Sequence, residues 1–429
     1  MRKIGIMVFA VLLLFAFASC QRDGQAVSTD PNAPVTLDVW CWDPNFNIFA
    51  MLEAEKIYQR IRPNVSLNVM DITSIEERLI AALSANDTST LPDIILQQDN
   101  SIEKFVTNFP RAYLPLNGHV DLSQFAPFKL AVGYVNGQNY GVPFDNGATA
   151  LFLRRDFIEQ AGLRVEDFNN ITWDRFIELG RRVRQATGKP MFSYGVQNGP
   201  EDLVHLVLMS TGSWYFDGQG RLNIQNNPAI REIINLYKNL IDNQVFLEVP
   251  DWNAYIASFS NEQVVGTLQG CWIIGSITPL RDQEGLWAMV NTPRLNTPGA
   301  ANYSSQGGSG WMVMSHTRYR DVAFDFLDKV WAGSVEFYET ILPPSGAIST
   351  WLPAANSTIY SQPQAFFGGQ RIYEELMDFA ARIPQVNMGV YSYEARSAVA
   401  RAAQNVSRGA NIDQELAAAH QEVQFLMDM

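Results

Sequence analysis

Polar and aromatic side chains follow two predicted β-strands in the first hundred residues. They are Trp42, Asp43 and Asn45 after the first strand, and Gln97, Gln98 and Asp99 after the third. The carboxyl ends of parallel strands meet at one edge of a sheet, where ligands bind. An aromatic ring packs against the C–H face of a sugar, and carboxylate or amide groups pair with its hydroxyls. These two loops therefore predict one carbohydrate cleft.

The tryptophans also have a plain structural interpretation. Trp40 is expected in the core, because it lies within the apolar strand. Trp42 could lie in the core or in the cleft, and the polar residues directly after it favour the cleft.

The elements that must position these loops alternate between strand and helix. Strands are predicted at 35–42, 65–69 and 91–96, and helices from 47 to a stop at Pro63 and from Ser74 to 83. Ser74 and Glu77 form the pattern of a capping box. The alternation predicts an α/β fold with a mainly parallel sheet flanked by helices.

The second half is richer in helical patterns. Thr172 is expected to cap a helix that stops at Gly188, and Asn227 with Pro228 starts another. Further helices are predicted around 323–331 and from 411 onward.

Three irregular breaks, at 143–148, 304–310 and 342–347, would suit a chain that crosses between two lobes three times. Asp145 lies at the first crossing and could accept ligand hydroxyls, although a turn role before Gly147 fits equally well. At the second crossing, Gly308 and Ser309 could offer backbone donors. Asn198 and Trp214 are weaker candidates for loop contacts from the second lobe.

The N-terminus predicts export. Arg2 and Lys3 precede an apolar run from 4 to 18, too short to span a bilayer comfortably. Phe17-Ala18-Ser19-Cys20 resembles a bacterial lipoprotein signal, in which Cys20 is lipidated, with Phe17 in place of the usual aliphatic residue. The alternative is an ordinary secretory peptide with an incidental cysteine. With the lipoprotein signal, residues 1–19 are the cleaved signal peptide and 20–34 a lipidated polar tether. The protein would therefore be exported, lipid-anchored at the cell membrane, and face the periplasm or the cell exterior.

The composition limits the other partners. The net charge of −13 argues against nucleic acid and against adhesion to anionic lipid. Cys41 and Cys271 could pair, but their apolar surroundings favour two buried free thiols. The four histidines have no metal-ligand spacing, and no cofactor motif is present.

Several segments together resemble the family 1 extracellular solute-binding proteins of ABC importers, and the lactose/arabinose-type branch in particular. They are Tyr140–Asp145 leading into 151–163, Thr172-Trp173-Asp174-Arg175-Phe176, Gly270-Cys271-Trp272, 307–311 with Phe326-Leu327, and 384–394. Each motif is weak alone, but their order is specific and covers the chain from about Val35 onward. Cys271 departs from the proline of the family pattern.

The resemblance implies a two-lobe periplasmic-binding-protein fold, each lobe with a mainly parallel sheet, joined by a multi-segment hinge. The N-terminal lobe would comprise 35–144 and 310–342, and the C-terminal lobe 145–309 and 343–429. It also implies that Trp272 and one or both of Tyr391 and Tyr393 line the cleft. The expected partners are a mono- or oligosaccharide and the ABC permease subunits, with the binding protein acting as a monomer.

Two other classes of function stay open at this point. A surface glycoside hydrolase would need two cleft carboxylates at a defined separation, and the 44 acidic residues do not exclude such a pair. A structural or adhesive lipoprotein is supported only by the predicted location. Enzyme motifs such as a nucleophile elbow or a phosphate loop are absent from the sequence.

Overall fold

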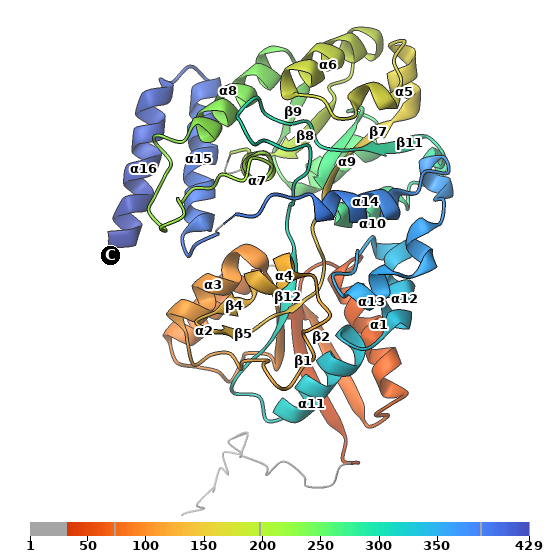
Figure 1. The fold of residues 1–429 in the computed structure, drawn as a ribbon, viewed down its shortest axis with the longest axis vertical. Coiled ribbons are helices and arrows are strands. Elements are labelled where there is room, and N and C mark those ends of the chain that lie inside the picture. The colour runs from red at the N-terminus through yellow and green to blue at the C-terminus, as the bar shows by residue number, and fades with distance from the viewer. Residues whose placement is uncertain (1–31, 73, 197–198, 387, 429) are drawn as a thin grey trace, which may run out of the picture. The chain divides into compact units, whose positions relative to one another are not determined.

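A computed structural model describes residues 32–428, apart from Thr73, Gln197, Asn198 and Asn387. The predicted signal and Cys20 lie outside these residues. From Pro34 onward the chain forms one compact unit, built from two lobes of strands and helices (Figure 1). None of the helices in the described part has the length and apolar character needed to cross a membrane.

The N-terminal lobe is built on a five-stranded sheet in the order β2-β1-β3-β12-β6. The strands are β1 (Val35–Cys41), β2 (Val65–Asp71), β3 (Ile94–Gln98), β6 (Val142–Pro143) and β12 (Ser309–Val313). β1 pairs in parallel with β2 and β3, as predicted, whereas β12 runs antiparallel to both β3 and β6. Within the described residues, β12 is thus the one strand of this sheet that runs against the others, and both β12 and the edge strand β6 belong to segments that cross between the lobes.

Alternation along these strands divides the N-terminal core into two layers. Val39 faces one layer, with α1 (Asn47–Gln59), α11 (Arg320–Phe326) and α12 (Val335–Ser345). Trp40 faces the other, with α2 (Ile75–Ser84) and α3 (Asp99–Asn108). Successive side chains of a strand point to opposite faces. Trp40 is therefore a core residue, as the sequence predicts.

The C-terminal lobe holds a three-stranded sheet in the order β10-β7-β11 and a parallel pair, β8-β9. The strands are β7 (Thr149–Arg154), β8 (Phe192–Gly195), β9 (Phe246–Val249), β10 (Gly266–Gly270) and β11 (Trp287–Val290). Both neighbours of β7 run antiparallel to it, unlike the mainly parallel sheet expected. All three strands are buried along their length, so none of them shows the alternation of buried and exposed residues typical of an antiparallel strand with one face in water.

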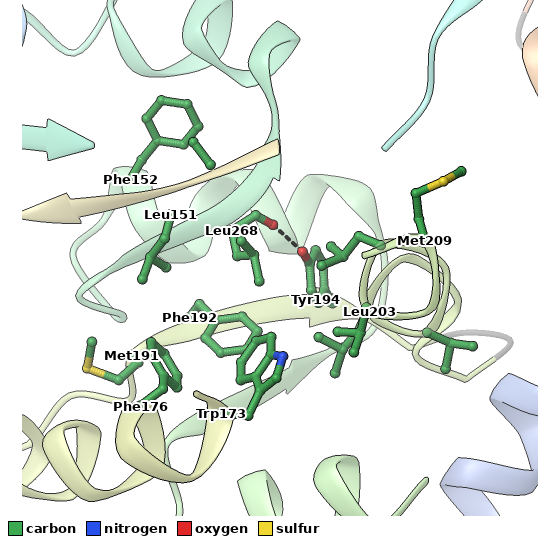
Figure 2. Close-up of a cluster of buried hydrophobic side chains, with 14 of the residues drawn as sticks. Leu151, Phe152, Trp173, Phe176, Met191, Phe192, Tyr194, Leu203, Met209 and Leu268 are labelled. Atoms are coloured by element: carbon green, nitrogen blue, oxygen red, sulfur yellow. Dashed lines mark hydrogen bonds between the residues drawn. The ribbon is translucent and has the colours of Figure 1, made fainter. Parts of the chain in front are cut away.

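Helices pack around these strands in a single large core. The main ones are α6 (Trp173–Thr187), α7 (Glu201–Met209), α8 (Pro228–Asp242), α9 (Trp252–Ser260), α14 (Ile372–Ala381), α15 (Ser392–Ser407) and α16 (Ile412–Asp428). Figure 2 shows part of this core, where the Tyr194 hydroxyl donates to the Leu268 carbonyl among Phe192, Trp173 and Leu203. Tyr194 thus links β8 to β10 of the three-stranded sheet.

Some local predictions, of helix caps, a strand boundary and the state of the cysteines, are confirmed, and others are wrong. Thr172 Oγ1 accepts from the Arg175 N–H at the start of α6, and Asn227 caps α8. The capping box at Ser74 is wrong, because this side chain makes no cap hydrogen bond. The third strand begins at Ile94 rather than Leu91, after the turn that contains Pro92. Cys41 and Cys271 are buried free thiols, as favoured.

The described chain passes between the two lobes three times. The first passage lies between β6 and β7, and the second between β11 and β12. The third is spread over residues 342–355: Leu342 and Ile348 pack in the C-terminal core, whereas Ala347, Trp351 and Ala354 pack in the N-terminal core. The segment after 343 therefore contributes to both lobes.

Candidate functional site

A cleft of about 920 Å³ is lined by residues from both lobes. Its N-terminal wall is formed by the loops after β1, β2 and β3, and its C-terminal wall by parts of α7, α9, the segment after β10, and α15. The carboxyl ends of three neighbouring strands thus meet at the cleft, as expected for this sheet type.

The loop after β1 is held by a residue that the sequence analysis did not single out. Asn47 is 1% exposed, and its side-chain oxygen accepts from the backbone N–H groups of Trp42 and Asp43, each at 3.0 Å. The Asn45 N–H donates to Asp43 Oδ1 at 2.8 Å. These bonds fix the loop, so Trp42 and Asp43 border the cleft while Trp42 still packs on the N-terminal core.

The base of the cleft is a cluster of buried charges, in which Asp99 and Lys129 of the N-terminal lobe lie beside residues of two crossings. The Lys129 ammonium forms an ion pair with Asp99, whose backbone N–H donates to the Gly308 carbonyl at 3.0 Å. Ser309 Oγ donates to Asp145 Oδ1 at 3.0 Å. Burial raises the pKa of Asp99 to about 6, although Lys129 opposes the shift. Burial also raises the pKa of Asp145 above its usual range.

Gly308 allows this cluster to close. Its φ is +91°, and an added Cβ would lie 2.4 Å from Asp99 Oδ2 and 2.7 Å from Lys129 Nζ. Glycine is the residue that adopts such a conformation at little cost and admits so close an approach.

Aromatic side chains form much of the C-terminal wall. The Trp272 indole donates to the Gln306 carbonyl at 3.1 Å, and its ring lies 5.6 Å from that of Trp252 at an angle of 39°. Trp252 is 45% exposed. The Arg396 guanidinium lies 4.9 Å from the centre of the Tyr393 ring. Together these groups give the wall broad faces for apolar contact.

Polar side chains of the same wall form a hydrogen bond and an ion pair. Asp202 Oδ1 accepts from Gln306 Nε2 at 2.7 Å, and Arg396 pairs with Glu201 at 3.3 Å. Burial raises the pKa of Asp202, opposed by Arg396. Burial lowers the pKa of His205 to about 3, so this imidazole is neutral.

Gln97 has unused hydrogen-bonding capacity in the cleft. It is 1% exposed, and neither its amide nitrogen nor its amide oxygen has a hydrogen-bond partner among the described residues. A buried amide without a partner is costly, and a bound polar molecule would satisfy it. The Gln97 amide therefore offers the cleft one hydrogen-bond donor and one acceptor side by side.

The structure brings most of the predicted site residues together. The cleft is lined by Trp42, Asp43, Asn45, Gln98, Asp99, Asp145, Trp272, Gly308, Ser309 and Tyr393. Tyr391 packs against the C-terminal core and is not among the lining residues. Trp214 is buried in that core, where its indole donates to the Met388 carbonyl and to Ser392 Oγ. Asn198 lies outside the described residues.

Several lining residues were not predicted, namely Trp252, Asp202, His205, Ser276, Gln306, Arg396 and, at and after the end of β2, Asp71, Ile72, Ser74, Ile75, Glu76 and Glu77. The loop after β2 could have been found, since it follows a parallel strand as the other two loops do. Trp252 gave no signal, because a tryptophan that begins a helix is usually a packing residue.

Within the described residues, no group of three or more His, Cys, Asp or Glu side chains is placed to hold a metal ion. Two lobes joined by three chain segments, with a polar and aromatic cleft between their strand ends, define a binding-protein fold. Solved structures agree: a protein from B. animalis subsp. lactis Bl-04, in complex with β-1,6-galactobiose, matches with a TM-score of 0.75 at 17% identity, over 90% of this chain and 96% of that one. At this identity the likeness shows the fold.

Sequence comparison establishes the family. The family described as "Bacterial extracellular solute-binding protein" matches residues 56–358. A lactose-binding protein of Rhizobium radiobacter is 36% identical, over 89% of this chain and 90% of its own. An arabinooligosaccharide-binding protein of Halalkalibacterium halodurans is 24% identical, over 74% and 72%. The chain belongs to the bacterial extracellular solute-binding proteins, and it is a binding protein rather than an enzyme.

Proposed function

We propose that this protein captures a carbohydrate outside the cytoplasm and delivers it, as a monomer, to an ABC transporter permease. The observation that carries the proposal is a cleft in which aromatic and polar side chains from both lobes converge. Trp42 faces it from one lobe, and Trp252 and Trp272 from the other. The names of the lactose- and arabinooligosaccharide-binding relatives support the same class of ligand.

The size of the cleft favours a sugar of two or more rings. At about 920 Å³ it lies near the upper end of the range for small-molecule sites, roughly 300–1,000 Å³. Trp252 and Trp272 supply two neighbouring aromatic rings to the same wall.

Closure of the lobes on the ligand is the proposed mechanism of capture. A ligand that contacts both walls only when they are close together shifts the population toward the closed form. In this proposal the hinge consists of the three crossings, and the cluster of Asp99, Lys129 and Asp145 lies beside two of them.

Membrane attachment through Cys20 is a separate proposal. The motif Phe17-Ala18-Ser19-Cys20 and the polar stretch that follows support a lipidated, tethered N-terminus on an exported protein. Mass spectrometry of the mature N-terminus should find a lipid-modified Cys20, and Cys20→Ala should move the protein from the membrane fraction to the soluble one. An unmodified Cys20 in the wild-type protein would contradict the proposal.

A thermal-shift screen of the chain from Gln21 onward, against mono- and oligosaccharides, tests the central function. A saccharide at about 100 times its dissociation constant adds about 2.7 kcal/mol of stability. We expect a selective response to one class of saccharide, strongest for those of two or more units. A flat response across sugars, with a clear response to an amino acid, peptide or polyol, would overturn the carbohydrate proposal.

A further inference from the structure

The cleft has a marked excess of negative charge. Its lining carboxylates are Asp43, Asp71, Glu76, Glu77, Asp99, Asp145 and Asp202. Among the described lining residues the one cation is Arg396, since His205 is neutral near pH 7.

The cations near the cleft are already occupied. Arg396 pairs with Glu201 at 3.3 Å, behind the wall. Lys129 is 3% exposed and pairs with Asp99 at the base. In the part of the chain that the structure describes, no ion pair involves Asp43, Asp71, Glu76, Glu77 or Asp145. Each of these two cations is therefore already neutralised by a carboxylate, although Arg396 Nε has no hydrogen-bond partner among the described residues.

The carboxylates come from both walls and from the base. Asp71 is the last residue of β2, and Glu76 and Glu77 belong to the first turn of α2. Asp145 lies at a crossing, and Asp202 on α7. Within a cleft with low-dielectric walls, charges of one sign reinforce each other's field. An anion would meet this field throughout the cleft rather than at one edge.

A second observation points to a ligand without an acidic group. The Gln97 amide is 1% exposed and has no hydrogen-bond partner within the part of the chain that the structure describes, so it offers a donor and an acceptor that match hydroxyl or amide groups. Neutral amide groups of this kind satisfy a sugar hydroxyl with no need for charge.

We infer that the cleft selects saccharides by charge: it accepts neutral and amine-bearing sugars and rejects uronates, sulfated sugars and sugar phosphates. This inference rests on the proposed function, and it adds the chemical class of sugar. The selection comes from repulsion between like charges, which grows as water leaves the closing cleft.

Calorimetric titration at pH 7.5 with two matched sets of disaccharides tests the inference. The first set is α-1,4-galactobiose with the digalacturonate and di-galactosamine of the same linkage, and the second is cellobiose, cellobiouronate and the chitosan dimer. We expect each uronate to bind at least about 100-fold more weakly than its neutral counterpart, as one close like charge would cause. The amine-bearing member should bind at least as tightly as the neutral one.

A charge-reduced variant separates repulsion from steric exclusion. Combining Asp71→Asn, Glu76→Gln and Glu77→Gln should bring the uronate affinity at least about 10-fold closer to that of the neutral sugar. A control with the same change in net charge combines Glu166→Gln, Asp282→Asn and Glu284→Gln, which lie outside the cleft lining and are exposed. This control should leave the ratio between the affinities for the neutral sugar and for the uronate unchanged.

Salt gives an independent measurement that needs no variant. Raising NaCl from 20 to 500 mM should narrow the ratio between the neutral sugar and the uronate, because exposed charges are screened. A uronate that binds as tightly as its neutral counterpart would overturn the inference and leave the carbohydrate function in place. Failure of every disaccharide in both sets, together with a flat saccharide screen, would overturn both.

Discussion

Trp272 is the residue through which a sugar would most directly contact the C-terminal wall. Its indole donates to the Gln306 carbonyl, and its ring packs against hydrophobic clusters of both lobes. The hydrogen bond fixes the orientation of the ring, and the face toward the cleft stays available. Trp272 is thus expected to govern binding more than folding.

Trp272→Ala should weaken saccharide binding by about 30-fold, since burial of an aromatic face contributes about 2 kcal/mol. Calorimetry measures the change. The matched control is Trp287→Phe, because Trp287 is 0% exposed in the C-terminal core and donates to Gln283. This control should lower the melting temperature and leave the affinity within about threefold. Equal losses of affinity in both variants would contradict a specific role for Trp272.

His205 gives a prediction on pH. Its pKa in the folded protein is about 3, against 6.5 for an unperturbed histidine. The unfolded chain therefore binds a proton below pH 6.5 that the folded protein does not, and this lowers stability as the pH falls.

Wild-type protein should lose about 2 kcal/mol relative to His205→Gln between pH 7 and pH 5, at about 1.4 kcal/mol for each pH unit below 6.5. Urea unfolding of both proteins at the two pH values measures the difference. Parallel pH dependences would show that His205 takes up a proton in the folded state.

At the scale of elements, the crossing that contains Gly308 carries the strongest steric constraint at the cleft. Gly308→Ala should cost at least about 3 kcal/mol, from the left-handed conformation and from contact with Asp99 and Lys129. Gly137→Ala is the control: its φ is +84°, yet an added Cβ meets nothing within 4 Å. That variant should lose about 1 kcal/mol in urea unfolding. Similar losses of unfolding free energy in both variants would mean that the segment around Gly308 can move to accommodate the added Cβ.

Much of the N-terminal lobe could be predicted from the sequence. Val65, Leu67 and Val69 alternate with polar residues, and β2 indeed spans Val65–Asp71. The site loops after β1 and β3 followed from the same pattern, because parallel strands place their carboxyl ends together. These predictions depend on short-range periodicity and one rule of topology.

The C-terminal lobe shows where such reasoning stops. β7 and β10 are buried along their whole length, so neither sequence reveals that they run antiparallel. Trp214 was a candidate for the cleft as a loop contact and Trp272 through the family resemblance, yet the Trp214 indole is hydrogen-bonded within the core. Which of two tryptophans reaches a cleft depends on long-range packing that local sequence does not record.

At the scale of the whole molecule, one ion pair connects the two lobes on the side of α3 and α15. Lys104 on α3 pairs with Glu394 on α15, and the two side chains are 20% and 23% exposed. Because it joins different lobes, this pair forms only when they are close together, and it should favour the ligand-holding arrangement.

Lys104→Met should therefore weaken saccharide binding by about two- to fivefold, the effect of a partly exposed ion pair. The control is Lys238→Met, which removes a pair with Asp242 within α8 alone. This control should leave the affinity unchanged in calorimetry. A stronger loss in the control would argue against a contribution from the pair between the lobes.

Capture of a sugar between the two lobes is tested most directly by hydrogen exchange, with and without the saccharide that stabilises the protein best. Ligand held in the cleft slows exchange in the loops that contact it. We predict joint protection of residues 42–47 and 97–101 in one wall, and of 270–276 in the other, with 306–309 at the crossing. Protection of one lobe alone, or of a surface away from these segments, would contradict the account.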